Sequence, residues 1–369
     1  MNIVLSSIAA LNNPKESARI TLLLLAKELQ KLGHDIRIIA KETKHKPNSQ
    51  INSQTYNNST AHIEGIPIYR TKLFQIPKLL SQLNKEKKID IIHLFSASPI
   101  FLLPHLFSPG KKIHSLKSYS KNHIGQMGYS FLLLADAITV PTNCFAAKIP
   151  FKKSFNKNKI HLIGSPIDVN KFYPKTSQNS TSPSDKNPKN NNRKKTSKIM
   201  YYGALTVHKG ANLLFEIIPL VIAKKPNTHF YIFPRHTNID HWREKAKTAG
   251  IDQYCTFNTN EVDIAQEVRN SDLIILPYVN LRGTDGNPSC LLEAMTCEVP
   301  IVTANLPELV EITQNTVALS VPHPQAFASQ ILSSLDHYHS QNLKDAAKLA
   351  QNYAAPSIAK QLDNLYKDL

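Results

Sequence analysis

The stretch Ser271–Thr303, which reads SDLIILPYVNLRGTDGNPSCLLEAMTCEVPIVT, decides the fold. Its two short apolar runs, Leu273–Pro277 and Ile301–Thr303, are typical of fully buried strands. The segment Pro288–Cys297 between them predicts a helix, because Asn287 suits an N-cap and the proline after it suits a first turn. A strand, a helix and a second strand in this order predict a right-handed crossover between parallel strands.

The same alternation extends through the chain. Strands are expected at Ile3–Ser6, Asp35–Ala40, Ile68–Arg70, Ile89–Leu94, Lys112–Leu116, Ala137–Val140, Ile160–Ile163, Ile199–Gly203, His229–Pro234 and Cys255–Phe257. Helices are expected at Glu16–Leu32, where Asn13 and Pro14 suit the cap and first turn, and at Ala211–Ala223, His241–Ala249 and Ser357–Leu369. Such alternation predicts an α/β protein with two Rossmann-like domains that face each other across a cleft.

The domain boundary is expected near the middle of the 369 residues. Residues 176–198 contain no apolar residue except two prolines, so this stretch cannot bury enough surface to offset its ordering entropy and is predicted to be a linker or loop. Residues 1–175 then form the first domain and residues 199–355 the second. The last helix, 356–369, is expected to cross back to the first domain.

The charge is distributed unevenly between these parts. Residues 1–175 carry +16, residues 176–198 carry +5 and residues 199–369 carry −4. The first domain therefore attracts anions, which include nucleic acid, anionic lipid and phosphate-bearing acceptors. Lysines alternate with apolar residues in Thr71–Lys88 and in 148–159, which suits an anionic membrane surface; the alternative is an ordinary solvated surface.

The compartment is expected to be the cytoplasm, with peripheral attachment to the inner membrane face as an option. The opening Met1–Leu5 resembles a strand and not a secretory leader. No apolar run approaches the ~20 residues that span a bilayer. The four cysteines have neither zinc-ligand nor redox spacing, so reduced and mostly buried thiols are expected.

Two clusters carry the candidate chemistry. In Tyr201–Gly210 a strand, a small-residue turn and a helix N-terminus present free N–H groups, and Lys209 adds a positive charge, which suits a diphosphate. The alternative is an ordinary strand–helix connection. In Asp285–Met295 the carboxylate Glu293 lies on an otherwise apolar helix, where hydrogen bonds from ribose hydroxyls would explain it. The alternative is a solvated Asp285 and a Glu293 paired with a lysine.

The order and spacing of these pieces resemble glycosyltransferase family 4, a group of retaining enzymes with the GT-B fold. The resemblance rests on segments throughout the chain: Leu32–Ile36, Ile89–His93, Ala135–Pro141, Lys159–Ile163, Ile167–Asp168, Lys171–Pro174, Gly203 with Lys209–Gly210, Ser271–Pro277, Leu292–Met295 and Val299–Val302. It is weakest over 41–66 and in the linker.

The resemblance implies a hexosyltransferase that uses a UDP- or GDP-linked sugar as donor and a lipid-linked or cell-envelope glycan as acceptor. Lys209 would bind the donor diphosphate beside Gly203 and Gly210. Asp285 would face the transferred sugar and Glu293 would hold the ribose. The remaining donor-binding positions would be the backbones of Gly286, Asn287 and Pro288. Retention would need no protein nucleophile, because the acceptor attacks on the face from which the nucleotide departs.

Four departures from the family pattern stand out. Ala204 occupies the position of an arginine that binds the diphosphate, and His208 and Arg282 are the candidate replacements. Asp285 replaces a glutamate. Asn12–Ser17 replaces a glycine-rich loop. Lys117 stands where the family has a first-domain histidine, and it is assigned here as a catalytic point charge for the diphosphate.

No cofactor, no obligatory metal and no nucleic acid partner are expected. Among the other histidines, His93 suits either the cleft or the core, and His105 has no evident partner. Two alternatives remain open: a catalytically degenerate GT-B scaffold that binds anionic lipid or nucleic acid, and a GT-B enzyme of other sugar chemistry, such as epimerisation or phosphorolysis.

Overall fold

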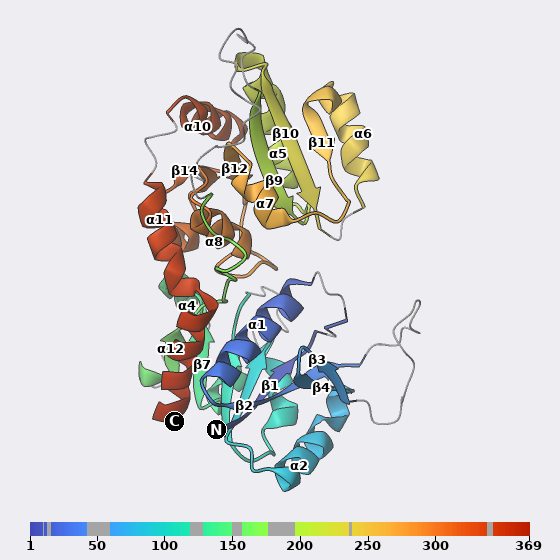
Figure 1. Ribbon diagram of the computed structural model, residues 1–369, viewed down its shortest axis with the longest axis vertical. Helices are drawn as coiled ribbons and strands as arrows, with labels where there is room; N and C mark the ends of the chain where they lie inside the picture. Colours follow the sequence, from blue (N-terminus) through green and yellow to red (C-terminus); the bar gives the residue numbers. More distant parts are fainter. Residues whose placement is uncertain are drawn as a thin grey trace, which may run out of the picture. The chain divides into compact units, whose positions relative to one another are not determined.

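The structure is a computed structural model that describes residues 1–9, 11–12, 16–42, 60–118, 128–149, 157–175, 196–235, 238–337 and 342–369. The expected cap at Asn13 and Pro14 and nearly all of the expected linker lie outside these residues. Unit 1 consists of residues 1–167, 282–287 and 353–369, and unit 2 consists of residues 168–281 and 288–352. Figure 1 shows each unit as a sheet with helices against it.

The sheet of unit 1 has the order β3-β4-β2-β1-β5-β6-β7-β8. Its strands are β1 (Asn2–Ser7), β2 (Asp35–Lys41), β3 (Thr60–Ile63), β4 (Ile66–Thr71), β5 (Ile91–Phe95), β6 (Lys111–Ser115), β7 (Ala137–Val140) and β8 (Ile160–Leu162). All neighbouring strands are parallel except β3 and β4, which form a hairpin that the sequence analysis did not predict. The predicted parallel sheet is confirmed.

Helices pack on both faces of this sheet because β1 is buried on both sides. Ile3 and Leu5 pack with α1 and α12, whereas Val4 packs with α2 on the opposite face. The helices of unit 1 are α1 (Ser17–Lys31), η1 (Leu73–Gln75), α2 (Ile76–Glu86), η2 (Pro99–His105), η3 (Tyr129–Leu134), α4 (Asn143–Ala147), η5 (Lys157–Lys159) and α12 (Ala355–Asp368), the η elements being 3-10 helices.

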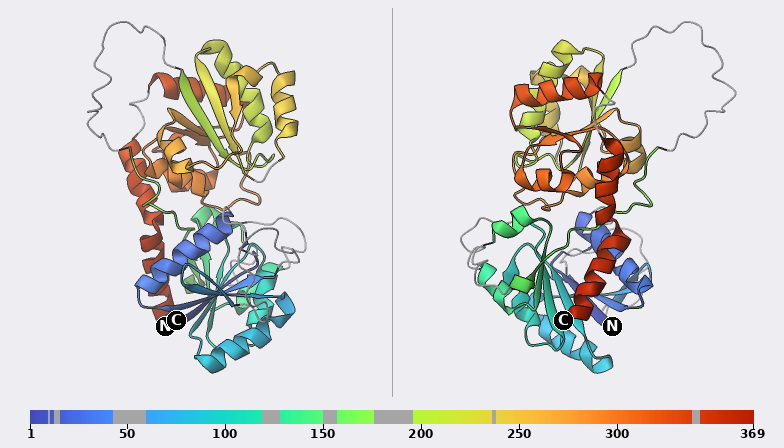
Figure 2. Two further views of the ribbon diagram at one scale, coloured as in Figure 1. Left: turned by 45° about the vertical axis from the view of Figure 1, so that its right-hand side comes forward. Right: turned by 90° about the vertical axis from the view of Figure 1, so that its left-hand side faces the viewer.

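The C-terminal helix α12 joins unit 1 through both apolar and polar contacts. Ile358 and Leu362 are buried against the core that α1 covers, and the views in Figure 2 show α12 beside α1. Asp363 Oδ1 lies 3.0 Å from His34 Nε2, and His34 Nδ1 lies 3.4 Å from the amino group of Met1. Both ends of the chain are therefore anchored to the same histidine.

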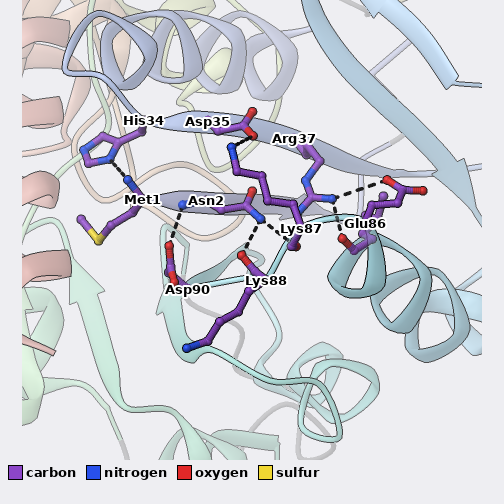
Figure 3. A network of polar contacts seen from close by, with 10 residues as sticks. Met1, Asn2, His34, Asp35, Arg37, Glu86, Lys87, Lys88 and Asp90 are labelled. Atoms are coloured by element: carbon purple, nitrogen blue, oxygen red, sulfur yellow. Dashed lines mark hydrogen bonds and ion pairs between the residues drawn. The ribbon is translucent and has the colours of Figure 1, made fainter.

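A network of polar contacts links residues at the amino end of this sheet (Figure 3). The side chain of Asn2 donates to the carbonyls of Lys87 and Lys88 at 2.9 and 2.6 Å, and the backbone N–H of Asn2 donates to Asp90 at 2.8 Å. Lys87 in turn pairs with Asp35 at 2.8 Å. Lys87, which the sequence analysis counted among the membrane-facing lysines, thus has a structural role at the amino end of the strands.

The sheet of unit 2 is parallel throughout and has the order β11-β10-β9-β12-β13-β14. Its strands are β9 (Ser197–Gly203), β10 (Thr228–Pro234), β11 (Cys255–Phe257), β12 (Leu273–Leu276), β13 (Ile301–Ala304) and β14 (Ala318–Ser320). The chain leaves β9 toward β10 on one side and returns to β12 on the other. This reversal of strand order between β9 and β12 is where ligands bind in open α/β sheets.

The helices of unit 2 are α5 (Ala211–Lys224), α6 (Asp240–Thr248), η6 (Asp252–Tyr254), α7 (Ile264–Arg269), α8 (Ser289–Thr296), α9 (Pro307–Thr313), α10 (Pro324–Asp336) and α11 (Leu343–Ala350), with η8 (Gln351–Tyr353) at the boundary to unit 1. Within the described parts of the chain, no helix is both long and apolar enough to cross a bilayer. The four cysteines are free thiols, of which Cys297 is buried and the others are half-buried.

Candidate active site

Two glycines of the first sequence cluster shape the carboxyl end of the unit 2 sheet. Gly203 ends β9 with a φ of +138°, and Gly210 caps α5 with a φ of +77°. A Cβ on Gly210 would lie 1.7 Å from the carbonyl oxygen of Pro277, the residue that follows β12. Only glycine allows this approach, and it places the N-terminus of α5 at the reversal between β9 and β12.

Two positively charged residues, Lys209 and Arg235, lie beside Gly203. Lys209 is half-buried, and its Nζ would lie 4.0 Å from a Cβ on Gly203. Arg235 follows β10 directly, and its backbone N–H donates to the carbonyl of Gly203 at 3.1 Å. Arg235 was not among the candidate residues predicted from the sequence. Its position immediately after a predicted strand was the available signal, since the residues that follow parallel strands gather at the ligand-binding edge.

Glu293 is the carboxylate of this site. It is half-buried on α8, and burial raises the pKa of its carboxyl, against the attraction of Arg235, contact with Tyr202 and the attraction of Lys171. Glu293 thus interacts with an arginine and a tyrosine hydroxyl in addition to a lysine, whereas the alternative interpretation from the sequence expected a lysine alone. A carboxylate held in such surroundings suits hydrogen bonding to the hydroxyls of a ligand.

Aromatic hydroxyls and a thiol surround Glu293. Tyr202 donates to the carbonyl of Cys290 at 2.5 Å, and the hydroxyl of Tyr278 lies 2.9 Å from Cys290 Sγ. Burial raises the pKa of Cys290, while the charges of Lys209 and Arg235 lower it. The positive charges of Lys209 and Arg235 therefore both act on this thiol, which lies in the first turn of α8.

The expected cap of α8 was wrong. Asn287 does not cap the helix: its Oδ1 accepts from the N–H of Ser165 at 3.1 Å and its Nδ2 donates to the carbonyl of Ser165 at 3.1 Å. Pro288 occupies the N-cap and offers no side-chain acceptor. The N–H groups at the start of α8 therefore lack a side-chain cap, as in anion-binding helix termini.

Lys117 and Asp285 lie together in unit 1. Burial lowers the pKa of the Lys117 ammonium and the negative charge of Asp285 raises it, and Asp285 also accepts from Ser165 Oγ at 3.3 Å. The backbone N–H of Gly286 donates to the carbonyl of Lys117 at 2.8 Å. The segment Arg282–Asn287, which the sequence analysis assigned to the second domain, clusters with unit 1 because of these contacts.

A small recess of unit 1 is lined by this group. A Cβ on Gly286 would lie 2.5 Å from Pro141 Cγ, and one on Gly164 would lie 2.9 Å from Asn287 Nδ2, so both backbones pass close to their neighbours. The residues around the recess come from the ends of β6, β7 and β8 and from the returning segment: Ser115, Leu116, Lys117, Thr139, Pro141, Ile163, Gly164, Ser165 and Asn287.

His93 and His105 are core residues of unit 1. His93 is fully buried between the hydroxyls of Tyr366 at 2.6 Å and Ser115 at 2.7 Å, which agrees with its interpretation as a satisfied core residue. His105, which had no evident partner in the sequence, forms a hydrogen bond with Ser6 Oγ at 2.8 Å.

The structure brings the candidate residues together in two groups. Unit 2 holds Gly203, Lys209, Gly210, Pro288 and Glu293, and unit 1 holds Lys117, Asp285, Gly286 and Asn287. Of the two candidate replacements for the missing arginine, His208 lies in unit 2 and Arg282 in unit 1. Among the described residues, no group of three or more His, Cys, Asp and Glu side chains is placed to hold a metal ion.

Comparison with known proteins finds one family model in each half of the sequence. Residues 18–171 match the model of "Glycosyltransferase Family 4", and residues 196–337 match that of "Glycosyl transferases group 1". Among curated proteins, none matches the sequence well enough to count as a relative.

Solved structures similar to the chain cover nearly its whole length. A sucrose-phosphate synthase from Thermosynechococcus elongatus has a TM-score of 0.75 at 17% identity, over 100% of this chain and 98% of that one. The Anabaena protein HepE in complex with UDP has a TM-score of 0.74 at 15% identity, over 100% of both chains. A glycosyltransferase from Rickettsia africae has a TM-score of 0.72 at 17% identity, over 100% and 98%. With two Rossmann-like units of the GT-B fold and a match to a family model in each half, the chain is a glycosyltransferase that belongs to family 4.

Proposed function

We propose that this glycosyltransferase is a hexosyltransferase that transfers a sugar, with retention, from a UDP-linked donor to a lipid-linked or other cell-envelope glycan. The observation that carries the donor half of this proposal is the meeting of Glu293, Lys209 and the glycine-shaped start of α5 at one edge of the unit 2 sheet. UDP is favoured over GDP because the similar Anabaena protein HepE was solved with UDP and with UDP-glucose.

In this proposal Glu293 accepts hydrogen bonds from the ribose hydroxyls of the donor. The ammonium of Lys209 and the N–H groups at the starts of α5 and α8 hold the diphosphate, with the backbones of Gly203, Gly210 and Pro288 around it. These groups favour negative charge, which grows on the diphosphate as the bond to the sugar breaks. The proposed reaction requires no cofactor and no metal.

Unit 1 contributes Lys117 and Asp285 to the proposed reaction. Asp285 accepts hydrogen bonds from the transferred sugar, and Lys117 adds a positive charge for the departing diphosphate. The carbon–oxygen bond to the diphosphate breaks, a bond to the acceptor oxygen forms on the same face, and the acceptor proton passes to the departing diphosphate. No protein nucleophile takes part.

The acceptor side of the proposal rests on the surface of unit 1. Phe107 is 88% exposed, and the neighbouring η2 and η3 expose further large apolar side chains. Lys112 donates to the carbonyls of Ser108 and Gly110 near the end of η2, and Lys159 donates to the carbonyl of Leu133 in η3. Exposed apolar side chains beside lysines suit an anionic membrane, where each charge contributes about 1 kcal/mol.

Donor binding is tested by calorimetry with UDP, GDP and ADP on the wild type and on Glu293→Ala. We expect UDP to bind the wild type, and we expect the variant to lose at least about tenfold in affinity, because hydrogen bonds to a charged group contribute about 1.5–3 kcal/mol. Glu267→Ala is the matched control, since Glu267 pairs with Lys198 at 2.7 Å at the opposite end of β9. Equal losses in both variants, or no binding of any nucleotide, would reject the proposed site.

Membrane attachment is tested by flotation with phosphatidylglycerol vesicles and with phosphatidylcholine vesicles. The wild type should float with the anionic vesicles, and Phe107→Ser should bind them several-fold less. Val321→Ser is the control, because Val321 is 54% exposed in unit 2. Vesicle binding that is the same for both lipids and is unchanged in Phe107→Ser would contradict this part of the proposal.

A further inference from the structure

The diphosphate site lacks one of the cations that the family resemblance led us to expect, because Ala204 follows Gly203. A UDP-sugar carries about two negative charges on its diphosphate, and Lys209 supplies one positive charge. Glu293 is itself an anion within the range of the same groups. A second cation near Gly203 would therefore increase the affinity for the donor, because the attraction between a cation and the diphosphate is stronger in a half-buried site than in water.

Arg235 is the cation that the tertiary structure places there. In the register between β9 and β10, Pro234 pairs with Gly203, so Arg235 is the first residue beyond β10 at the carboxyl edge. Its N–H holds the carbonyl of Gly203 at 3.1 Å. The side chain of Arg235 is half-buried, like that of Lys209.

The positive charges of Arg235 and Lys209 both lower the pKa of the same residue, Cys290. Both cations counteract the effect of burial on the Cys290 thiol, which lies in the first turn of α8, and Arg235 also attracts the Glu293 carboxylate. Arg235 and Lys209 come from the ends of different segments, one after β10 and one before α5. Their charges therefore act on the first turn of α8 from two different elements, an arrangement that suits a diphosphate.

We propose that Arg235 binds the donor diphosphate and supplies, from the neighbouring strand, the positive charge that the family places at position 204. This inference rests on the proposed donor site. A guanidinium has five N–H donors in a plane and can bond two phosphate oxygens at once, which a lysine cannot do. The competing role is structural: Arg235 would neutralise Glu293 and so act only on the ribose end of the donor.

The two roles differ in which part of the ligand they affect. We would measure the affinities of the best-binding nucleoside diphosphate, its monophosphate and its nucleoside for the wild type, Arg235→Ala and Arg235→Lys. If Arg235 contacts the diphosphate, Arg235→Ala lowers the affinity for the diphosphate about 10- to 100-fold and leaves that for the nucleoside unchanged. Arg235→Lys should recover part of the loss.

A double variant sharpens this test. Ala204→Arg in the Arg235→Ala background restores the cation at the position used by the family, so the diphosphate affinity should recover while the nucleoside affinity stays constant. Arg243→Ala is the control, because Arg243 is an exposed arginine on α6 of the same unit. Circular dichroism and thermal unfolding would establish that each variant is folded.

Two results would overturn the inference. An equal loss for nucleoside and diphosphate would assign Arg235 to the support of Glu293, and an unchanged diphosphate affinity would remove it from the site. In both cases the wild type still binds the nucleotide, so the proposed function stands. Absence of nucleotide binding to the wild type would instead reject the proposed function itself.

Discussion

Gly210 and Pro277 approach so closely that a single added methyl group on Gly210 would lie 1.7 Å from the carbonyl oxygen of Pro277. The contact joins the start of α5 to the end of β12, the two elements that border the proposed diphosphate site. Glycine at position 210 is therefore required by sterics as well as by its φ of +77°.

Gly210→Ala should destabilise the protein by about 3 kcal/mol or more, because the left-handed conformation costs about 1–2 kcal/mol and the contact with the Pro277 backbone adds strain. Gly250→Ala is a matched control: Gly250 has a φ of +65°, and a Cβ there would meet nothing within 4 Å. It should lose only about 1 kcal/mol. Urea unfolding measures both, and equal losses would show that the Pro277 contact is unimportant.

Glu293→Gln should raise stability at neutral pH while it weakens nucleotide binding. Burial raises the pKa of Glu293, so the folded state favours the protonated form, and the wild type loses stability as the pH rises through that pKa. The neutral glutamine avoids this loss. The difference in melting temperature between variant and wild type should therefore be near zero below about pH 4, where the wild-type carboxyl is protonated, and positive at pH 7. A variant that melts below the wild type at pH 7 would contradict this reasoning.

The buried histidines should make unit 1 sensitive to acid. Burial lowers the pKa of His105 and of His114 to about 4, and that of His93 falls well below its usual value. Because the folded state holds these rings neutral, stability is fully present above pH 6.5 and is lost as the pH falls toward 4, by up to roughly 3 kcal/mol for His105 or His114.

Thermal unfolding between pH 7 and pH 4 measures this loss. His105→Gln should be less stable than the wild type at pH 7 but should show a shallower decline toward pH 4. The control is His62→Gln, which changes an exposed histidine of β3. A decline as steep in His105→Gln as in the control would mean that His105 does not cause the acid sensitivity.

Lys117→Met should lower turnover by about 100-fold, a loss typical when a group that stabilises negative charge in the transition state is removed. Nucleotide affinity should change much less, and the melting temperature should not fall, because burial disfavours the charged ammonium. Lys111→Met serves as control, since Lys111 lies at the amino end of β6, the strand that precedes Lys117, and pairs with Asp136 at 3.6 Å. Unchanged turnover would remove Lys117 from the proposed catalytic residues.

The sequence by itself determined the class of fold and most of its elements. Alternating apolar runs and helical segments predicted β1, β2, β7, β10 and β12 to within two residues. A buried parallel strand consists of consecutive apolar residues, so the sequence of the strand itself shows where it lies. The order of the motifs also indicated the family. Lys209 was predicted from its place between a strand and a helix N-terminus, and Glu293 from its place on an otherwise apolar helix.

Only the tertiary structure decided which distant residues meet. Asn287 seemed a helix cap from its neighbours, yet it bonds Ser165, 122 positions away, and so the segment Arg282–Asn287 belongs to unit 1. Arg235 lies beside Gly203 because β9 and β10 pair in one register. Local patterns report how each segment folds; which side chains then come together depends on packing and strand register over the whole chain, and this brings Arg235 to the edge where Lys209 and Glu293 lie.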